Sequence, residues 1–160
     1  MSELKVNEYD VVLLKAVDGD TVDVDIDLGF GIWLRDERVR IMGIDTPESR
    51  TSDKVEKVFG TAAKNRLKEL LADGGKLITT ENKDGEDMKG KFGRILGDFT
   101  VYDAATDAWR PVTAVMIQEG HCVAYFGGSK EEVQEQHMKN RRRLIEEGVV
   151  NMTLEQAGLV

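Results

Sequence analysis

The chain has 160 residues, of which 22 are Lys or Arg and 30 are Asp or Glu, so its formal net charge at pH 7 is −8. This length suits one domain with its own hydrophobic core, and the single cysteine excludes a disulfide framework or a cysteine-rich zinc site. The negative charge disfavours a protein that coats nucleic acid through a broad basic surface, but it is compatible with an enzyme that binds phosphate at one small cationic site.

The first half of the chain predicts three β-strands, over residues 11–17, 21–28 and 32–44. The second of them alternates strictly, with apolar residues on one face and carboxylates on the other: Val22, Val24, Ile26 and Leu28 against Asp23, Asp25 and Asp27. We expect the acidic face to be solvated. Asp20 falls on the apolar side of this alternation, where a carboxylate costs free energy unless it is paired or binds a cation.

A helix is predicted to follow Asp53, because Asp53 and Glu56 fit an N-terminal capping box. Its apolar residues recur at helical spacing and predict one buried face: Val55, Val58, Phe59, Ala62, Ala63, Leu67, Leu70 and Leu71. Two more strands are predicted over residues 76–81 and 92–102, with a polar loop at 82–90 between them.

The last third predicts a turn at 103–109, a short helix over 112–119 and an extended piece at 122–126. Ser129 and Glu132 form a second capping box, which opens a polar helix. Five strands interrupted by helices predict an α+β fold, a small closed β-barrel with three packed helices. We expect one domain over residues 1–160, with the barrel core at about 8–126 and the C-terminal helix at about 129–147.

Four short motifs carry side chains suited to phosphate chemistry: DGDT at 18–21, RIMGIDTPE at 40–48, KFGR at 91–94 and Tyr125. Asp20 and Asp45 offer hard oxygen ligands, which suit calcium or magnesium better than zinc or copper. Arg40 and Arg94 can make bidentate, charge-assisted hydrogen bonds to a phosphate. Glu48 follows Asp45 by three residues and can take a proton from water. Each motif is weak alone, but together they predict a site for phosphodiester hydrolysis.

As a set, five segments resemble the staphylococcal nuclease (thermonuclease) family, in that family's order and with similar spacing: VDGDT at 17–21, VRIMGIDTPE at 39–48, VEKVFGTAA at 55–63, KFGRILGD at 91–98 and GHCVAY at 120–125. The resemblance implies an OB-fold barrel with five strands and three helices. It also implies a calcium-dependent endo- and exonuclease acting on DNA and RNA, in which water attacks phosphorus in line and 3′-phosphate ends remain.

The resemblance implies a role for each motif residue. Asp20 and Asp45 match the ligands of one Ca²⁺, and Thr46 matches a position that ligates through its backbone carbonyl. Glu48 matches the proposed general base, or the residue that orients the attacking water.

The remaining matches concern the nucleotide. Arg40 and Arg94 match the two arginines that bind phosphate, while Lys91, Phe92 and Tyr125 match positions that contact the terminal phosphate and base. Phe92 stands where the family's pattern has a tyrosine, so a hydroxyl contact to substrate is lost, while the aromatic ring needed for stacking is present.

Two alternatives stay open at this point. One is an OB-fold module that binds nucleic acid with weak or no catalysis, and the other is a protein whose acidic face mimics nucleic acid. Retention of Arg40, Glu48 and Arg94 favours the enzyme, because a binding module is free to lose them.

The histidines and the lone cysteine have simpler interpretations. His137 lies in a polar helix and is expected to be solvated, while His121 and Cys122 are expected to be structural. We expect the arginines at 141–143 to form a salt-bridged helix face with nearby glutamates.

The expected partner is a DNA or RNA substrate, bound by a monomer. No apolar run approaches the roughly 18 residues of a membrane span, so no membrane partner is expected. The N-terminus lacks the features of a signal peptide, which favours a cytoplasmic or phage-encoded protein, or the mature form of a secreted one.

Overall fold

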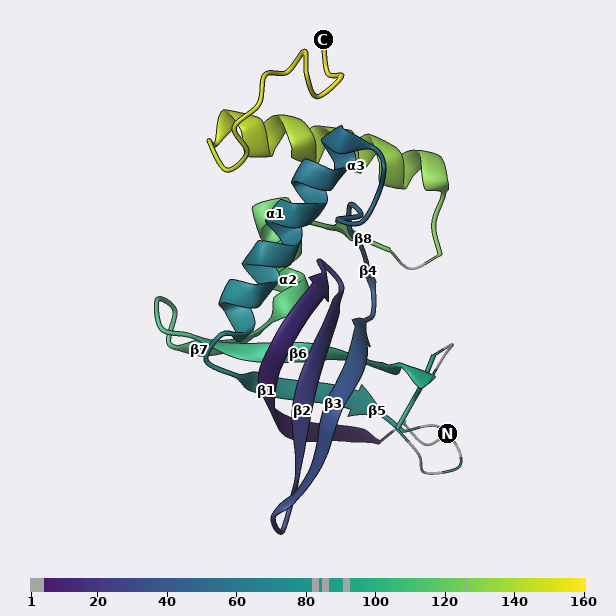
Figure 1. The fold of residues 1–160 in the computed structure, drawn as a ribbon, viewed down its shortest axis with the longest axis vertical. Coiled ribbons are helices and arrows are strands. Elements are labelled where there is room, and N and C mark those ends of the chain that lie inside the picture. The colour runs from purple at the N-terminus through teal and green to yellow at the C-terminus, as the bar shows by residue number, and fades with distance from the viewer. Residues whose placement is uncertain (1–4, 82–83, 85–86, 91–92, 126) are drawn as a thin grey trace.

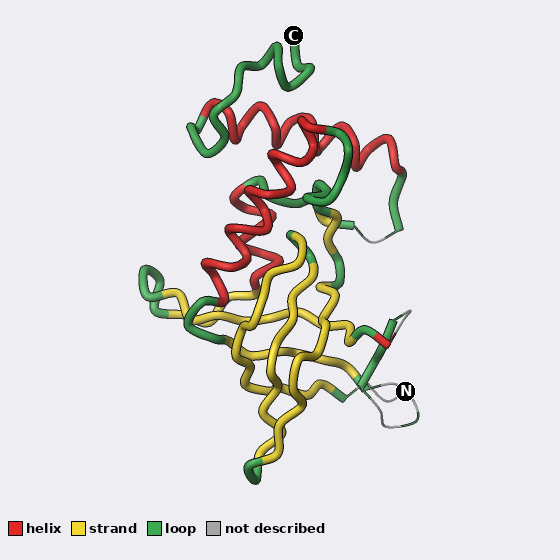
Figure 2. Tube along the Cα trace, in the orientation of Figure 1, coloured by secondary structure: helices red, strands yellow, loops and turns green. Residues whose placement is uncertain are grey.

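The computed structural model describes residues 5–81, 84, 87–90, 93–125 and 127–160. Strands and helices lie at opposite ends of the molecule, as Figure 1 and Figure 2 show. Six strands form the main sheet: β1 (Val6–Asp18), β2 (Thr21–Gly29), β3 (Ile32–Ile41), β5 (Gly75–Thr80), β6 (Ile95–Asp103) and β7 (Ala108–Pro111).

The main sheet closes on itself. Its strand order is β3-β2-β1-β5-β6-β7, with antiparallel neighbours throughout. A parallel pairing of β3 with β6, which sets Val39 against Ile95 and Arg40 against Leu96, joins the two ends of the five-strand series. The predicted OB-type, five-stranded α+β arrangement is confirmed, with β7 as an extension of the ring.

Three helices complete the fold: α1 (Lys54–Leu71), α2 (Val112–Glu119) and α3 (Lys130–Glu146). Asp53 caps α1 as predicted, since its Oδ1 accepts hydrogen bonds from the backbone N–H groups of Val55 and Glu56 at 3.0 and 3.1 Å. The Glu56 half of the predicted box is not formed, because Glu56 Oε2 accepts from the Glu48 N–H and the Asp53 N–H donates to Thr51 Oγ1. The predicted bounds of α2 agree with the structure, and Ser129 caps α3 as expected.

Helix α1 connects the barrel to α3. Ala63 and Leu67 on one side of α1 join the barrel core. Phe59, one turn earlier on the same face, packs in a second cluster with Leu144 of α3. Val58, which was predicted to belong to the buried stripe, is exposed, because it lies off this face. The two clusters place the helices at one end of the ring.

The predicted strand over 32–44 is interrupted, and this break matters for the site. β3 ends at Ile41, and pairing resumes in β4 (Ile44–Asp45), which pairs with β8 (Val123–Ala124) in a separate small sheet. Gly43 has a φ of 81°, a left-handed conformation that a regular strand does not contain. The chain therefore leaves the ring at Gly43 and carries Asp45 toward the helices.

The bounds of three other strands differ from the prediction. β1 begins at Val6 because its pairing with β5 continues to Val6 opposite Thr80, beyond the apolar run that signalled the strand. β7 replaces the end of the predicted turn, since Ala108 pairs with Asp103. β6 begins at Ile95, and the predicted start at residue 92 lies outside the described residues.

The sequence predicts a solvated acidic face on β2, but the structure shows two of its carboxylates paired with arginines. Asp23 accepts hydrogen bonds from Arg38 Nε and Nη2 at 2.8 and 3.2 Å, and Asp25 accepts one from Arg35 Nη1 at 3.0 Å. The antiparallel register sets Asp23 directly opposite Arg38, so neighbouring strands balance part of this negative charge.

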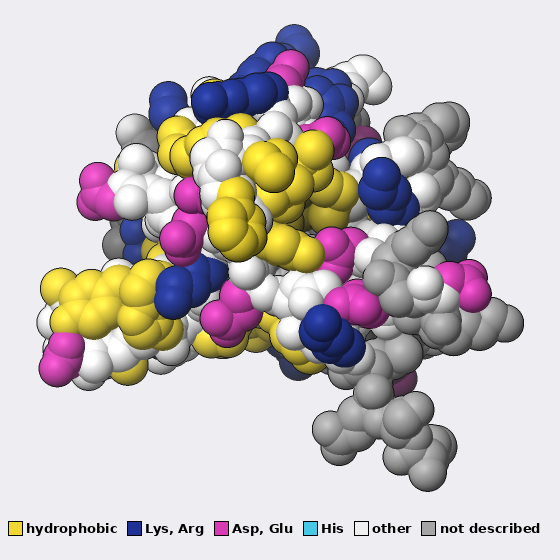
Figure 3. Space-filling model, turned by 90° about the horizontal axis from the view of Figure 1, so that it is seen from below, with side chains coloured by type: hydrophobic (Ala, Val, Ile, Leu, Met, Phe, Trp, Pro, Cys, Tyr) yellow, Lys and Arg dark blue, Asp and Glu magenta, His cyan; other side chains and the backbone are white. Residues whose placement is uncertain are grey.

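Exposed apolar side chains gather on two hairpins of the main sheet. Figure 3 shows them over the β2–β3 hairpin and over the β6–β7 hairpin. They include Leu28, Phe30, Ile32 and Leu34 on the first hairpin, and Tyr102 and Trp109 on the second. No helix within the described residues is long and apolar enough to cross a bilayer.

Candidate active site

Asp20 and Arg40 form an ion pair where β2 and β3 meet. Arg40 Nη1 lies 3.1 Å from Asp20 Oδ2, and the two side chains are only 29% and 17% exposed. The strand register sets Thr21 opposite Arg40, and Thr21 Oγ1 donates to Asp20 Oδ1 at 2.8 Å. The predicted requirement that Asp20 be paired is met by Arg40, and partial burial makes this pair stronger than one on the open surface.

Asp45 is held from the C-terminal helix. His137 Nε2 lies 2.6 Å from Asp45 Oδ2, and the His137 side chain is only 11% exposed. The prediction that His137 is solvated is therefore wrong. Helix α3 lies over β8, where Asn140 Nδ2 donates to the backbone carbonyl of Cys122 at 3.3 Å, and this contact turns His137 toward β4.

The negative charges of Asp20 and Asp45 both influence the buried thiol of Cys122. The pKa of the Cys122 thiol is raised to about 12, first by burial and then by the negative charges of Asp20, Asp98 and Asp45. Two carboxylates that are 25 residues apart in the chain therefore lie near the same thiol. Cys122 itself is buried and uncharged, in agreement with the structural role predicted for it.

Gly19 allows the first motif to approach the second. A Cβ atom on Gly19 would lie 2.9 Å from Ala63 Cβ and 3.3 Å from Thr46 Cβ. Only a residue without a side chain fits this space without displacing α1 or Thr46. The turn that carries Asp20 thus packs directly on the segment that carries Asp45.

The donor set here suits a hard cation. Among the residues described, no group of three or more His, Cys, Asp or Glu side chains could hold a metal ion. Two carboxylates and the backbone carbonyl of Thr46 are all oxygen donors, and Ca²⁺ completes such partial shells with water and substrate oxygens. The residues present therefore fit calcium, with a protein shell that is incomplete by itself.

The backbone of Glu48 is fixed, while its side chain is exposed. A Cβ on Gly60 of α1 would lie 2.3 Å from the Glu48 carbonyl oxygen, so these two backbones are in direct contact. The Glu48 N–H donates to Glu56 Oε2 at 3.1 Å, and the next N–H, of Ser49, donates to Asp18 Oδ1 at 3.1 Å. These contacts hold the proline turn against both α1 and the DGDT turn.

Arg94 and Tyr125 are positioned by separate contacts. Arg94 lines a hollow of about 500 Å³ together with Thr21, which bonds to Asp20. The backbone N–H of Tyr125 donates to the carbonyl of Gly43 at 2.9 Å, and its side chain is exposed. Lys91 and Phe92, the other two predicted nucleotide contacts, lie outside the described residues.

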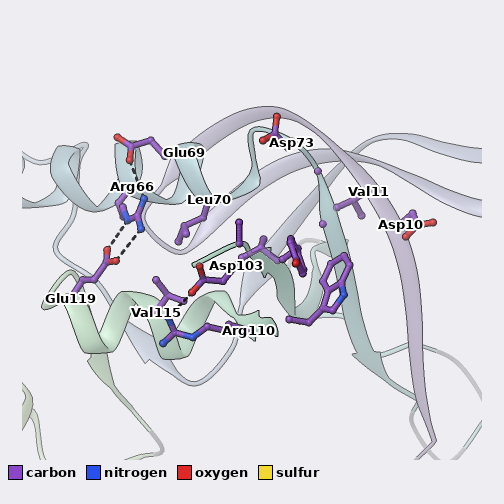
Figure 4. A pocket seen from close by; sticks show the side chains of 16 residues that line it. Asp10, Val11, Arg66, Glu69, Leu70, Asp73, Asp103, Arg110, Val115 and Glu119 are labelled. Atoms are coloured by element: carbon purple, nitrogen blue, oxygen red, sulfur yellow. Dashed lines mark hydrogen bonds and ion pairs between the residues drawn. The ribbon is translucent and has the colours of Figure 1, made fainter. Parts of the chain in front are cut away.

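A second hollow, of about 590 Å³, lies between α1, α2 and the β6–β7 hairpin and contains none of the predicted site residues (Figure 4). Its arginines are engaged: Arg66 bonds to Glu119 Oε1 and Oε2 at 2.6 and 2.9 Å, and Arg110 bonds to Asp103 at 3.3 Å. Acidic residues outnumber basic ones in the lining, which makes this hollow unsuitable for a polyanion.

Sequence reasoning missed His137 and Asp98. His137, Asn140 and Leu144 recur at spacings of three and four, a helical pattern that could have identified the buried face of α3. Asp98 accepts a hydrogen bond from Thr113 Oγ1 at 2.7 Å, and burial raises the pKa of its carboxyl group. No local pattern marks Asp98, because its burial depends on α2 packing over β6.

Comparison with known proteins agrees with this arrangement. The family model described as "Staphylococcal nuclease homologue" matches residues 38–148, more than half of the chain. A curated relative, "Endonuclease YhcR" of Bacillus subtilis (strain 168), is 27% identical over 124 residues, which cover 74% of this chain and 9% of that protein. The chain thus spans a small part of that relative. On the strength of the family match, the chain belongs to the staphylococcal nuclease homologue family.

Proposed function

We propose that this protein is a calcium-dependent phosphodiesterase that hydrolyses DNA, RNA or both. The observation that carries the proposal is the Asp20–Arg40 ion pair, 3.1 Å long, beside the segment that holds Asp45 and Glu48. Membership of the family supports nuclease chemistry, and the word endonuclease in the relative's name agrees with it.

Asp20, Asp45 and the carbonyl of Thr46 would hold one calcium ion. Bound calcium would place positive charge against the phosphate oxygens and the attacking water. Before binding, Asp20 is neutralised by Arg40 and Asp45 is oriented by His137. The two carboxylates are thereby kept in place without a third acidic ligand.

Arg40 and Arg94 would bind the phosphate. Both contacts that the structure gives Arg40, to Asp20 and to the Ile41 carbonyl, use Nη1. Its Nε and Nη2 groups therefore keep donors in the fork geometry that matches phosphate oxygens. These guanidinium groups stabilise the charge that develops as the phosphorus gains a fifth oxygen.

Glu48 would accept the proton of the attacking water. Its carboxylate is exposed while its backbone is anchored, so it can reach a substrate without a change in the fold. The water oxygen forms a new bond to phosphorus, the P–O5′ bond breaks, and the 5′ oxygen leaves with the electron pair and takes a proton from solvent. The products are a 3′-phosphate and a 5′-hydroxyl end.

The test is the chemistry of the product ends and its dependence on Glu48. A 5′-labelled single-stranded oligonucleotide is incubated with calcium, and the fragments are treated with phosphatase. We expect a gel shift that reports removal of a 3′-phosphate, and about 10²-fold slower cleavage by Glu48→Gln. Glu8→Gln, at the far end of β1, is the matched control. Products without 3′-phosphate would contradict the proposed bond cleavage, and binding without cleavage would favour the alternative, an OB-fold binding module.

A further inference from the structure

We propose that the hollow beside Arg94 is a second phosphate subsite, formed by Arg50 and Arg38, which would hold a bound strand at a phosphate next to the one that is cleaved. The inference rests on the proposed function and extends it. The hollow of about 500 Å³ is lined by six residues: Thr21, Glu37, Arg38, Arg50, Gly93 and Arg94.

The lining of this hollow is positively charged, unlike that of the other hollows. Three arginines face one glutamate in its lining, a net charge of +2 in a chain whose net charge is −8. The lining of four other hollows formed by described residues is neutral or negative. A polyanionic strand bound at Arg94 is therefore attracted into this hollow more strongly than into the other four.

The three arginines come from separate segments. Arg38 lies on β3, Arg50 follows the proline turn, and Arg94 precedes β6. Arg38 and Arg40 are two residues apart on one strand, so they face the same side at a spacing of about 6.6–6.8 Å. A row of cations along one strand can be followed by successive phosphates of a flexible single strand.

Arg50 is the cation best placed to bind a phosphate. Its side chain is exposed, and no hydrogen bond or ion pair joins it to any of the residues described. Its position is fixed by the neighbouring Ser49 N–H, which donates to Asp18 at 3.1 Å, and by the close contact of this segment with Gly60. An anchored backbone limits the conformational entropy that binding would cost.

Arg38 would have a supporting role. Its Nε and Nη2 groups bond to Asp23, so only Nη1 makes no hydrogen bond to the residues described, and the Asp23 carboxylate offsets the charge of Arg38. Arg50→Gln is therefore the informative change, and Arg50→Lys tests whether charge alone suffices. Arg35→Gln is the matched control, because Arg35 also lies on β3 but is paired with Asp25 and does not line the hollow.

The experiment compares substrates of two lengths. A dinucleotide has only the scissile phosphate, whereas a ten-nucleotide single strand can also occupy the subsite. We expect Arg50→Gln to lower the ratio of kcat/KM for the ten-mer to kcat/KM for the dinucleotide by about 3–10-fold, with Arg50→Lys intermediate. Arg35→Gln should keep the wild-type ratio. A ratio unchanged by Arg50→Gln would overturn the subsite.

Binding separates this proposal from the proposed function. Anisotropy of a labelled ten-mer is measured against salt in chelator, where no cleavage is expected. For Arg50→Gln, the slope of log affinity against log salt should fall by about 0.7, the value for one phosphate contact on a single strand. Loss of this slope in a protein that never cleaves would keep the subsite and reject the nuclease. Cleavage by the wild type, with a salt slope that Arg50→Gln leaves unchanged, would keep the nuclease and reject the subsite.

Discussion

His137 Nε2 lies 2.6 Å from Asp45 Oδ2, so helix α3 supports a carboxylate at the end of the barrel although 92 residues separate the two positions. A donor that fixes one oxygen of a metal-binding carboxylate orients the other, and loss of such support commonly weakens metal binding about 10–100-fold. In the proposed calcium site, helix α3 would thus support Asp45 and not only cover the barrel.

We therefore expect His137→Leu to weaken calcium binding by about 10–100-fold, measured by calorimetry on the protein without substrate. Lys139→Gln, an exposed change on the same helix, should leave calcium affinity at the wild-type value. Equal calcium affinities in wild type and His137→Leu would show that His137 does not support the metal site.

Gly60→Ala tests the contact between α1 and the backbone of Glu48. Gly60 is a buried position in the interior of α1. Alanine is more favourable than glycine in a helix interior by about 1 kcal/mol, so helix propensity alone predicts stabilisation. The new Cβ would meet the Glu48 carbonyl oxygen at 2.3 Å, however, and must displace it. We expect a loss of about 1–3 kcal/mol in the free energy of unfolding.

The same substitution should slow cleavage at least tenfold, because Glu48 moves away from the reacting phosphate. Chemical denaturation and kcat are the measurements, with Thr61→Ala on the exposed face of α1 as the control. A stabilised Gly60→Ala protein with wild-type kcat would contradict the contact.

Arg40→Ala and Arg94→Ala should each lower turnover by about 10²-fold or more, since each removes a preorganised donor to the transition state. Both proteins should remain folded by circular dichroism, because neither arginine belongs to the buried core. Arg35→Ala, on the same strand as Arg40, serves as the control and should retain activity. Full activity in Arg40→Ala would remove that side chain from the mechanism.

Because the fold holds the Cys122 thiol neutral, we expect the protein to lose stability at high pH. Its pKa is raised from 9.0 to about 12 in the folded protein, so the unfolded chain releases the proton at lower pH than the folded one. The contribution of the neutral Cys122 thiol to the free energy of unfolding is fully present below pH 9. It declines as pH rises toward 12, by at most about 1.4 kcal/mol per pH unit.

Urea unfolding of wild type and Cys122→Ala at pH 8 and pH 10.5 isolates this effect, because other groups that titrate in this range are common to both proteins. Wild type should lose more of its free energy of unfolding between the two pH values than Cys122→Ala. The same loss in both would mean that the thiol is not held neutral by the fold.

Much of the fold was predictable because its signals are local. The alternation in β2, the caps at Asp53 and Ser129, and the apolar stripe of α1 each lie within one element. The break at Gly43 and the start of β1 were not predicted, since pairing between distant strands decides them.

For the proposed site, sequence motifs suggested the residues but not the side chains that support them. The pairing of Asp23 with Arg38 depends on the register of the β2–β3 hairpin, and the His137–Asp45 contact depends on where α3 packs. Both follow from tertiary structure. Arg50 was overlooked because nothing in its local sequence distinguishes it from an ordinary surface charge.

Calcium-dependent cleavage is tested most directly with a single-stranded oligonucleotide and a supercoiled plasmid, incubated with wild-type protein at low salt, first with chelator and then with excess calcium. We expect no cleavage in chelator and restored cleavage with calcium, lost again in Arg40→Ala. Folded wild-type protein that shows no calcium-dependent cleavage of either substrate would contradict the proposed function.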